Sequence, residues 1–305
     1  MDHLTQATVT TASAAVARIH YLVNAAWSLA AVAAVDPSAT LGADRGRVLA
    51  AWGLATIKDG GYVLAPGLAE LLADAEQARF LNLVGHLRQT VTAATGVTGW
   101  HHHDDDTLLE QGRASVAGIR LGMRQTLRLL DGLGERLAEP GAEVLDVGVG
   151  TGGMLAALCA DLPELHGTGI DVLPRALDLA KRMVADHGVA ERVELRLQDV
   201  ATLADRDRYD MVWLPTMFIP QAAVYASLPR LLEALRPGGW LVLAGVSYHG
   251  DRLSDAVTAW RAGRDGGTAA PVDEMVERLV ATGYAEVLRL PVPPGAPAVV
   301  GARRR

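Results

Sequence analysis

Glycines at every second position follow an acidic residue in the stretch Glu143-Val-Leu-Asp-Val-Gly-Val-Gly-Thr-Gly-Gly, whose residue types could bind a nucleotide-like ligand. Apolar residues around Asp146 predict a short buried strand, and an apolar helix is expected from Met154. Between them, Gly148 and Gly150 let the backbone approach a ligand closely, with helical N–H groups pointing at it. The stretch therefore predicts a ligand-binding turn from a strand into a helix.

A second acidic residue ends the next predicted strand. Asp171 follows the glycine turn by about 20 residues, the spacing at which nucleotide-binding folds place a carboxylate on ribose hydroxyls. Val172 is then expected against the adenine face. A third strand is predicted over 193–197, and Asp199 and Val200 follow it at the same edge of the sheet.

The elements that must position these residues alternate between strand and helix. A fourth strand is expected over 209–214, a fifth after the turn Arg236-Pro-Gly-Gly, and a closing strand pair over 285–291 and 298–303. This pattern predicts an α/β fold, a Rossmann-like doubly wound seven-stranded sheet with helices on both faces. Its ligand is expected at the carboxyl ends of the strands.

Five segments occur in order within about residues 140–305: VLDVGVGTG, GIDVL, LQDV, YDMVWL and LRPGGWLVL. Together they resemble the motifs of the class I S-adenosylmethionine (SAM)-dependent methyltransferases. The resemblance implies SAM as the cofactor, and an Asp199 carboxylate that accepts from the adenine amino group. The implied cofactor-binding residues are Asp146, Gly148, Gly150, Asp171, Val172, Asp199, Val200 and Leu214.

The sequence differs from this family at the position where the catalytic base is expected. In small-molecule O-methyltransferases a histidine just after the fourth strand usually takes the proton, but the corresponding stretch here is LPTMFIPQ. His249, after the fifth strand, is the first substitute, and the alternative is a solvent-exposed loop histidine. The histidines of 101–103 come next, and a reaction that needs no protein base is the third possibility.

The acceptor is expected near the joint between two domains, where small-molecule clefts form. Aromatic and sulfur-containing side chains there suit an apolar pocket, although they could equally belong to the core. The predicted substrate-contacting residues are Trp100, His101, Met217 and Phe218.

The run His101-His-His-Asp-Asp-Asp106 has two further interpretations. Imidazoles and carboxylates are good metal ligands, but adjacent residues in a regular element cannot all point at one ion. In the alternative interpretation the run is a polar loop, with Asp105 or Asp106 capping a long helix expected over 107–137. We favour histidines and Trp100 that overhang the substrate pocket, without a metal.

The first hundred residues predict a helical domain. Helices are expected over 13–35 and 45–54, a β-hairpin around Asp59-Gly-Gly, and another helix from Leu68, which is the order of a winged helix. The segment DGGYVLAPG resembles the wing of the N-terminal dimerisation domain of small-molecule O-methyltransferases. The expected domains are 1–105 (winged helix) and 106–305 (SAM-binding). The alanine-rich first helix is apolar on nearly all sides and should be covered, which suggests a homodimer.

Charge and composition indicate which classes of partner and which cell compartment to expect. The chain has 305 residues, a net charge of −7 and a pI near 5.7, which argues against a nucleic-acid-binding surface. Its one cysteine, Cys159, is expected to be a small buried residue, and a reducing cytoplasm fits. The start of the chain lacks a basic region typical of a secretory signal, and the apolar stretch 21–35 is too short to span a bilayer.

The leading hypothesis is a cytoplasmic, homodimeric SAM-dependent methyltransferase that methylates an oxygen or a carbon of a small molecule in specialised metabolite biosynthesis. One alternative keeps the fold and SAM but catalyses a cyclisation or decarboxylation without methyl transfer. Another is a SAM-sensing winged-helix regulator, although its recognition helix would offer two basic residues, Arg45 and Arg47. The sequence does not name the acceptor.

Overall fold

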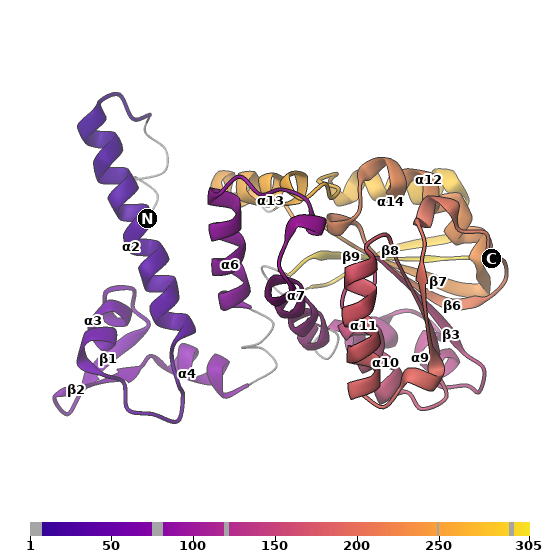
Figure 1. The fold of residues 1–305 in the computed structure, drawn as a ribbon, viewed down its shortest axis with the longest axis horizontal. Coiled ribbons are helices and arrows are strands. Elements are labelled where there is room, and N and C mark those ends of the chain that lie inside the picture. Colours follow the sequence, from indigo (N-terminus) through magenta and orange to yellow (C-terminus); the bar gives the residue numbers. More distant parts are fainter. Residues whose placement is uncertain (1–7, 75–81, 119–121, 249, 293–295) are drawn as a thin grey trace. The chain divides into compact units, whose positions relative to one another are not determined.

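The computed structural model describes residues 8–74, 82–118, 122–248, 250–292 and 296–305. It divides into two compact units, Met1–Thr95 and Gly96–Arg305, which are treated separately here (Figure 1). The division falls before the expected boundary at residue 105. The segment around Trp100 therefore belongs to the same unit as the glycine turn.

The N-terminal unit contains helices and one small hairpin. The hairpin turns at Asp59 and Gly60, both with positive φ (51° and 77°), as a two-residue hairpin loop requires. The predicted helix–helix–hairpin order is found, while a winged-helix assignment stays a prediction. The elements are α2 (Ala12–Ala33), α3 (Ala43–Ala51), β1 (Ala55–Lys58), β2 (Gly61–Leu64), α4 (Pro66–Ala73) and α6 (Leu83–Ala94).

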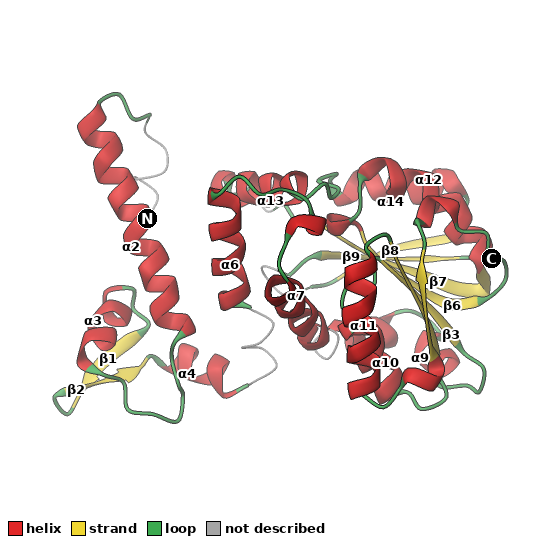
Figure 2. Ribbon diagram, in the orientation of Figure 1, coloured by secondary structure: helices red, strands yellow, loops and turns green. Residues whose placement is uncertain are grey.

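Helix α2 packs against α3 and α6 but is not covered (Figure 2). None of its residues is buried within the described part of the chain, and Trp27 is 72% exposed. The indole N–H of Trp52 donates to the Ser28 hydroxyl at 2.8 Å, which fixes one side of the helix to α3. The expectation that this helix is buried is thus wrong for the single chain, because its apolar surface exceeds what the neighbouring helices can cover.

The C-terminal unit is built on the expected seven-stranded sheet, in the order β5-β4-β3-β6-β7-β9-β8. Strands β3 to β7 are parallel, and β9 and β8 add antiparallel pairs at one end. Sequence order reverses between β3 and β6, which is where ligands bind in such sheets. The strands are β3 (Glu143–Val147), β4 (His166–Asp171), β5 (Val193–Leu197), β6 (Tyr209–Pro215), β7 (Leu235–Gly245), β8 (Glu286–Leu290) and β9 (Ala298–Arg303).

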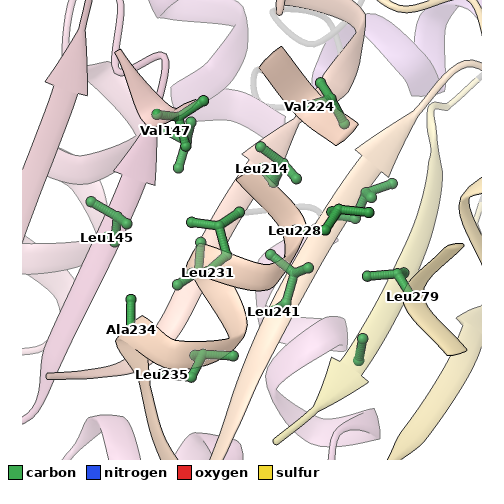
Figure 3. Close-up of a cluster of buried hydrophobic side chains, with 14 of the residues drawn as sticks. Leu145, Val147, Leu214, Val224, Leu228, Leu231, Ala234, Leu235, Leu241 and Leu279 are labelled. Atoms are coloured by element: carbon green, nitrogen blue, oxygen red, sulfur yellow. The ribbon is translucent and has the colours of Figure 1, made fainter. Parts of the chain in front are cut away.

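Helices cover both faces of the sheet, as a doubly wound fold requires. Figure 3 shows Leu228 and Leu231 of one helix beside Leu145, Leu214 and Leu241 of the sheet. That face holds α12 (Gln221–Ala234) and α14 (Val272–Thr282). The other face holds α9 (Leu133–Leu137), α10 (Gly153–Asp161) and α11 (Pro174–Asp186).

Cys159 lies in α10 and is fully buried against this second face. Burial raises the pKa of its thiol to about 11, so the residue is a small apolar core residue, as expected.

The region between Trp100 and the sheet differs from the expectation. A single helix over 107–137 is wrong, because the helical chain that includes α7 (Asp105–Gly118) and α8 (Arg124–Leu129) is interrupted between α8 and α9. Gly132, with a φ of 69°, turns the chain between the last two. The cap of α7 is also a different residue, since the Asp104 carboxylate accepts from the Thr107 N–H at 2.7 Å. Helix α13 (Arg252–Arg264) was not predicted.

Candidate cofactor and acceptor site

The glycine turn joins β3 to α10 in the conformation that its sequence predicts. Gly148, Gly150 and Gly152 have φ of 68°, 54° and 75°, a region that other residues rarely adopt. A Cβ at Gly148 or Gly150 would meet no atom closer than 3.6 Å. The backbone at these two positions is therefore open to a ligand.

The next two glycines serve packing instead. A Cβ on Gly152 would come within 3.1 Å of Ala180 in α11, and one on Gly153 within 2.5 Å of the Gly112 carbonyl oxygen in α7. A Cβ on Gly112 would in turn overlap the Thr151 hydroxyl. Helix α7 thus packs against the end of the glycine turn through Gly112.

Asp171 lies at the end of β4, where it was predicted to bind ribose hydroxyls. One carboxylate oxygen accepts from the Gly150 N–H at 2.8 Å, and the other accepts from the Leu173 N–H at 2.9 Å. Burial raises the pKa of this carboxyl, and the backbone hydrogen bonds partly offset the effect. Each oxygen has further lone pairs, so Asp171 can hold the turn and still accept from a ligand.

Asp146 is the second acidic residue of the site and is 2% exposed. Its pKa is raised well above the usual range, first by burial and then by the negative charge of Asp171. In the absence of a ligand, a buried carboxylate next to a second carboxylate destabilises the protein. It is suited to a ligand that brings positive charge.

This leads to a prediction for Asp146→Asn in the ligand-free protein. The raised pKa means that ionisation of Asp146 costs stability as pH rises above the ordinary value of 3.8. We therefore expect the neutral variant to melt higher than the wild type at pH 7, with the difference shrinking as pH falls toward 4. Thermal melts between pH 4 and 8 measure this, and Asp178→Asn, an exposed acid on α11, is the control. A variant that melts lower at pH 7 would contradict the prediction.

Exposed apolar side chains lie where the adenine is expected. Val172 is 59% exposed, and Leu197, which pairs with Asp171 in the sheet register, is 62% exposed. Leu197 was not predicted, although an apolar residue at a strand end just before Gln198-Asp199 is the available signal. The Asp199 carboxylate accepts from the Ala201 N–H at 2.8 Å and is exposed.

Two predicted cofactor-binding residues have buried side chains. Val200 is 5% exposed at the start of a short helix (Val200–Thr202). Leu214 is fully buried and packs toward α12 (Figure 3). Both belong to the core cluster on the α12 face of the sheet, so a ligand could reach Leu214 through its backbone alone.

The predicted acceptor residues are partly brought together. Trp100 lies in the short helix Trp100–His102, and its ring is 5.3 Å from that of Phe218 in the short helix Thr216–Phe218 after β6. Met217 is half-buried beside Phe218. His101 is exposed, and its ring lies 3.8 Å from that of His102. His249 lies outside the described residues.

Two further candidate residues of the site, Thr107 and Thr151, were missed by the sequence reasoning. Four buried polar atoms find no hydrogen-bond partner within the described ranges: Trp100 Nε1, His103 Nδ1, Thr107 Oγ1 and Thr151 Oγ1. Buried polar groups are nearly always satisfied, so each of these atoms points to a missing ligand or water. Thr151 is signalled by its place between two glycines of the turn, whereas nothing in the sequence distinguishes Thr107.

No group of three or more histidine, cysteine or acidic side chains that could hold a metal ion occurs among the residues the structure describes. The buried histidine of the run, His103, is held by Asp265 instead, at 3.1 Å. A helix long and apolar enough to cross a membrane is likewise not found in the described ranges.

Comparison with known proteins identifies the domain. Residues 144–239 match a family model described as a methyltransferase domain. A release factor glutamine methyltransferase from Cereibacter sphaeroides is 43% identical over 108 residues, which are 34% of this chain and 38% of that protein. The chain spans 38% to 53% of the length of the first curated relatives it matches.

Solved structures resemble the chain over nearly its whole length. Human N-acetylserotonin methyltransferase in complex with SAM has a TM-score of 0.65 at 13% identity, covering 98% of this chain and 99% of that one. The mitomycin 7-O-methyltransferase MmcR has a TM-score of 0.60 at 20% identity, covering 96% and 98%. At these identities the likeness concerns the fold.

Residues 144–239 are thus a methyltransferase domain, the solved structures show the class I methyltransferase fold, and SAM is the cofactor. The residues present fit that group. The site offers open glycine backbone, two buried carboxylates for a cationic ligand, exposed apolar side chains for an adenine, and polar atoms that have no partner among the described residues.

Proposed function

We propose that this protein transfers a methyl group from SAM to an oxygen or carbon of a small-molecule acceptor, in specialised metabolite biosynthesis. The observation that carries the proposal is the open glycine turn flanked by the buried carboxyls of Asp146 and Asp171, at the carboxyl ends of β3 and β4. That arrangement suits a cationic adenosyl ligand, and the methyltransferase comparisons agree with it.

SAM supplies a methyl group already activated on a positively charged sulfur. The protein therefore has to orient the acceptor, enclose the reacting groups and take up one proton. Helix α7 packs against the glycine turn, and in this proposal it helps to exclude water. Trp100 and Phe218 provide apolar rings at the end of β6, where an acceptor can approach the methyl group. Their side chains favour an acceptor with a flat apolar part.

The small-molecule acceptor is supported by the extent of the structural likeness. Two methyltransferases named for small molecules, N-acetylserotonin and mitomycin, match the fold over at least 96% of this chain. The release factor methyltransferase matches 108 residues of the shared domain alone. The likeness therefore extends to the N-terminal unit for the small-molecule enzymes.

A homodimer is part of the proposal, because α2 exposes a row of large apolar side chains in the single chain. A helix of this kind suits an interface with a second copy. The side chains are Val16, Ile19, Leu22, Val23 and Trp27. A net charge of −7 and a single buried cysteine support a cytoplasmic protein that does not bind nucleic acid.

Calorimetry with SAM, followed by mass spectrometry of reactions with a panel of hydroxylated aromatic compounds that includes catechol, tests the proposal. We expect binding of SAM, a product heavier by one methylene, and a particle of twice 32.2 kDa in light scattering. Absence of SAM binding would end the proposal. Substrate turnover with SAM unconsumed would favour the non-methylating alternative. A particle of monomer mass in light scattering would contradict the proposed homodimer.

A further inference from the structure

His103 is the buried histidine of the run that precedes α7. Its side chain is fully buried, and Nε2 lies 3.1 Å from Oδ1 of Asp265, whose side chain is 6% exposed. The second carboxylate oxygen of Asp265 accepts from the Arg264 guanidinium at 2.6 Å. Arg264 also donates to the carbonyl of Val97 at 3.0 Å. The imidazole, carboxylate and guanidinium therefore form a buried chain.

These hydrogen bonds determine which nitrogen of the His103 imidazole carries the hydrogen. A carboxylate paired with arginine can only accept, so Nε2 of His103 carries the hydrogen and donates it to Asp265. In a neutral imidazole the other nitrogen, Nδ1, is then an acceptor. Nδ1 is buried and finds no hydrogen-bond partner in the described parts of the chain. Leaving a buried acceptor unpaired is unfavourable, because the atom has lost its hydrogen bond to water, so we expect a ligand that donates to it.

His103 lies at the edge of the sheet where the methyl group is expected. Its backbone carbonyl accepts from Arg175, in the first turn of the helix that follows Asp171. Its ring lies 4.8 Å from that of Trp100, which contacts Phe218 at the end of β6. Contacts on both sides thus place His103 between the ends of β4 and β6, which flank the glycine turn after β3.

We propose that Nδ1 of His103 is the general base for a hydroxyl acceptor, with Asp265 as its positioning residue; this rests on the methyl transfer proposed above. The O–H bond of the acceptor breaks and its proton passes to Nδ1, while the oxygen forms a bond to the methyl carbon. The S–CH3 electron pair stays on sulfur, which becomes a neutral thioether. The positive charge ends on the imidazolium, which Asp265 stabilises.

The proposal explains the missing histidine after β6. The stretch that follows β6 supplies Phe218 but no imidazole, and the loop before α7 supplies the imidazole from the other side of the same edge. His101 and His102 are exposed and lie against each other. Of these three histidines, His103 is the one for which the described residues provide a carboxylate partner.

Nuclear magnetic resonance of 15N-labelled histidine tests the assignment without an acceptor. We expect His103 to carry its hydrogen on Nε2 in the wild type, and to populate both tautomers in Asp265→Asn. A hydrogen on Nδ1 in the wild type would overturn the proposal, because that nitrogen could not accept a proton. This reading stands whether or not SAM binds, so failure of the proposed function, seen as no SAM binding by the wild type, is distinguished from failure of the base.

Kinetics with catechol and 4-nitrocatechol separate a base from a merely structural histidine. His103→Gln should slow single-turnover methylation of catechol by about 10²–10⁴-fold, and Asp265→Asn by roughly 10–100-fold, with SAM affinity within threefold of the wild type. The deficit should shrink for 4-nitrocatechol, which gives up its proton more readily. His187→Gln is the control, because His187 is an exposed histidine at the C-terminal end of α11. Equal losses of rate for both acceptors, or parallel losses of SAM affinity and melting temperature, would show that His103 has a structural role only. If the wild type methylates neither acceptor, the tautomer seen by nuclear magnetic resonance decides.

Discussion

Replacing Asp171 by alanine is expected to weaken SAM binding by at least about a hundredfold. The carboxylate holds Gly150 and Leu173 through their N–H groups and is predicted to accept from both ribose hydroxyls. Hydrogen bonds to a charged group contribute about 1.5–3 kcal/mol each, and 1.4 kcal/mol is tenfold in affinity. Losing two such bonds, together with one acceptor of the glycine turn, gives the stated effect. Isothermal calorimetry with SAM measures it.

Two further variants make this result interpretable. Asp178→Ala removes an acid whose side chain is 67% exposed on α11, where it pairs with Lys181, and should bind SAM like the wild type. Asp171→Asn keeps the shape and one acceptor oxygen, so its affinity should fall between those of the wild type and the alanine variant. Circular dichroism and melting curves establish that the alanine variant is folded. An affinity within tenfold of the wild type in folded Asp171→Ala would show that the carboxylate does not hold the ribose.

Replacing Trp240 by alanine should lower the free energy of unfolding by about 3–5 kcal/mol. Trp240 comes from the segment LRPGGWLVL that resembles a methyltransferase motif, but its side chain is fully buried under the sheet with Leu133 and Leu137 of α9. Its indole N–H donates to the carbonyl of Asp131 at 3.2 Å. Removing the ring leaves a cavity and an unpaired carbonyl, because the closely packed side chains around it can relax only partly into the space.

Urea unfolding followed by circular dichroism measures the loss, and the chain offers a matched control. Trp260 lies on α13 with 60% of its surface exposed, so Trp260→Ala should change the free energy of unfolding by no more than about 0.5 kcal/mol. A loss below about 1 kcal/mol for Trp240→Ala would mean that the core closes over the missing ring. Below its unfolding transition, the variant should still bind SAM, because Trp240 lies away from the carboxyl ends of the strands, paired with Met211 at the other end of β6.

The cofactor half of the protein was largely determined by the sequence itself. Glycines at 148, 150 and 152 adopt positive φ, a local backbone property that residue type enforces without help from distant contacts. The alternation of strands and helices fixed the parallel sheet, since short βα connections leave few other topologies. The same local rules predicted Asp171 at the end of β4 and the hairpin at Asp59-Gly60.

Tertiary structure decided the features that depend on partners distant in sequence. Burial of His103 rather than His101 follows from Asp265 and Arg264, more than 160 residues further along the chain, and no spacing within the run His101–Asp106 encodes that pairing. The break between α8 and α9 and the cap at Asp104 were missed because several neighbouring residues could serve locally and packing against the sheet selects among them. Local chemistry thus determined the conformation of the glycine turn, whereas side-chain packing decided which histidine of the run is buried and paired with a carboxylate.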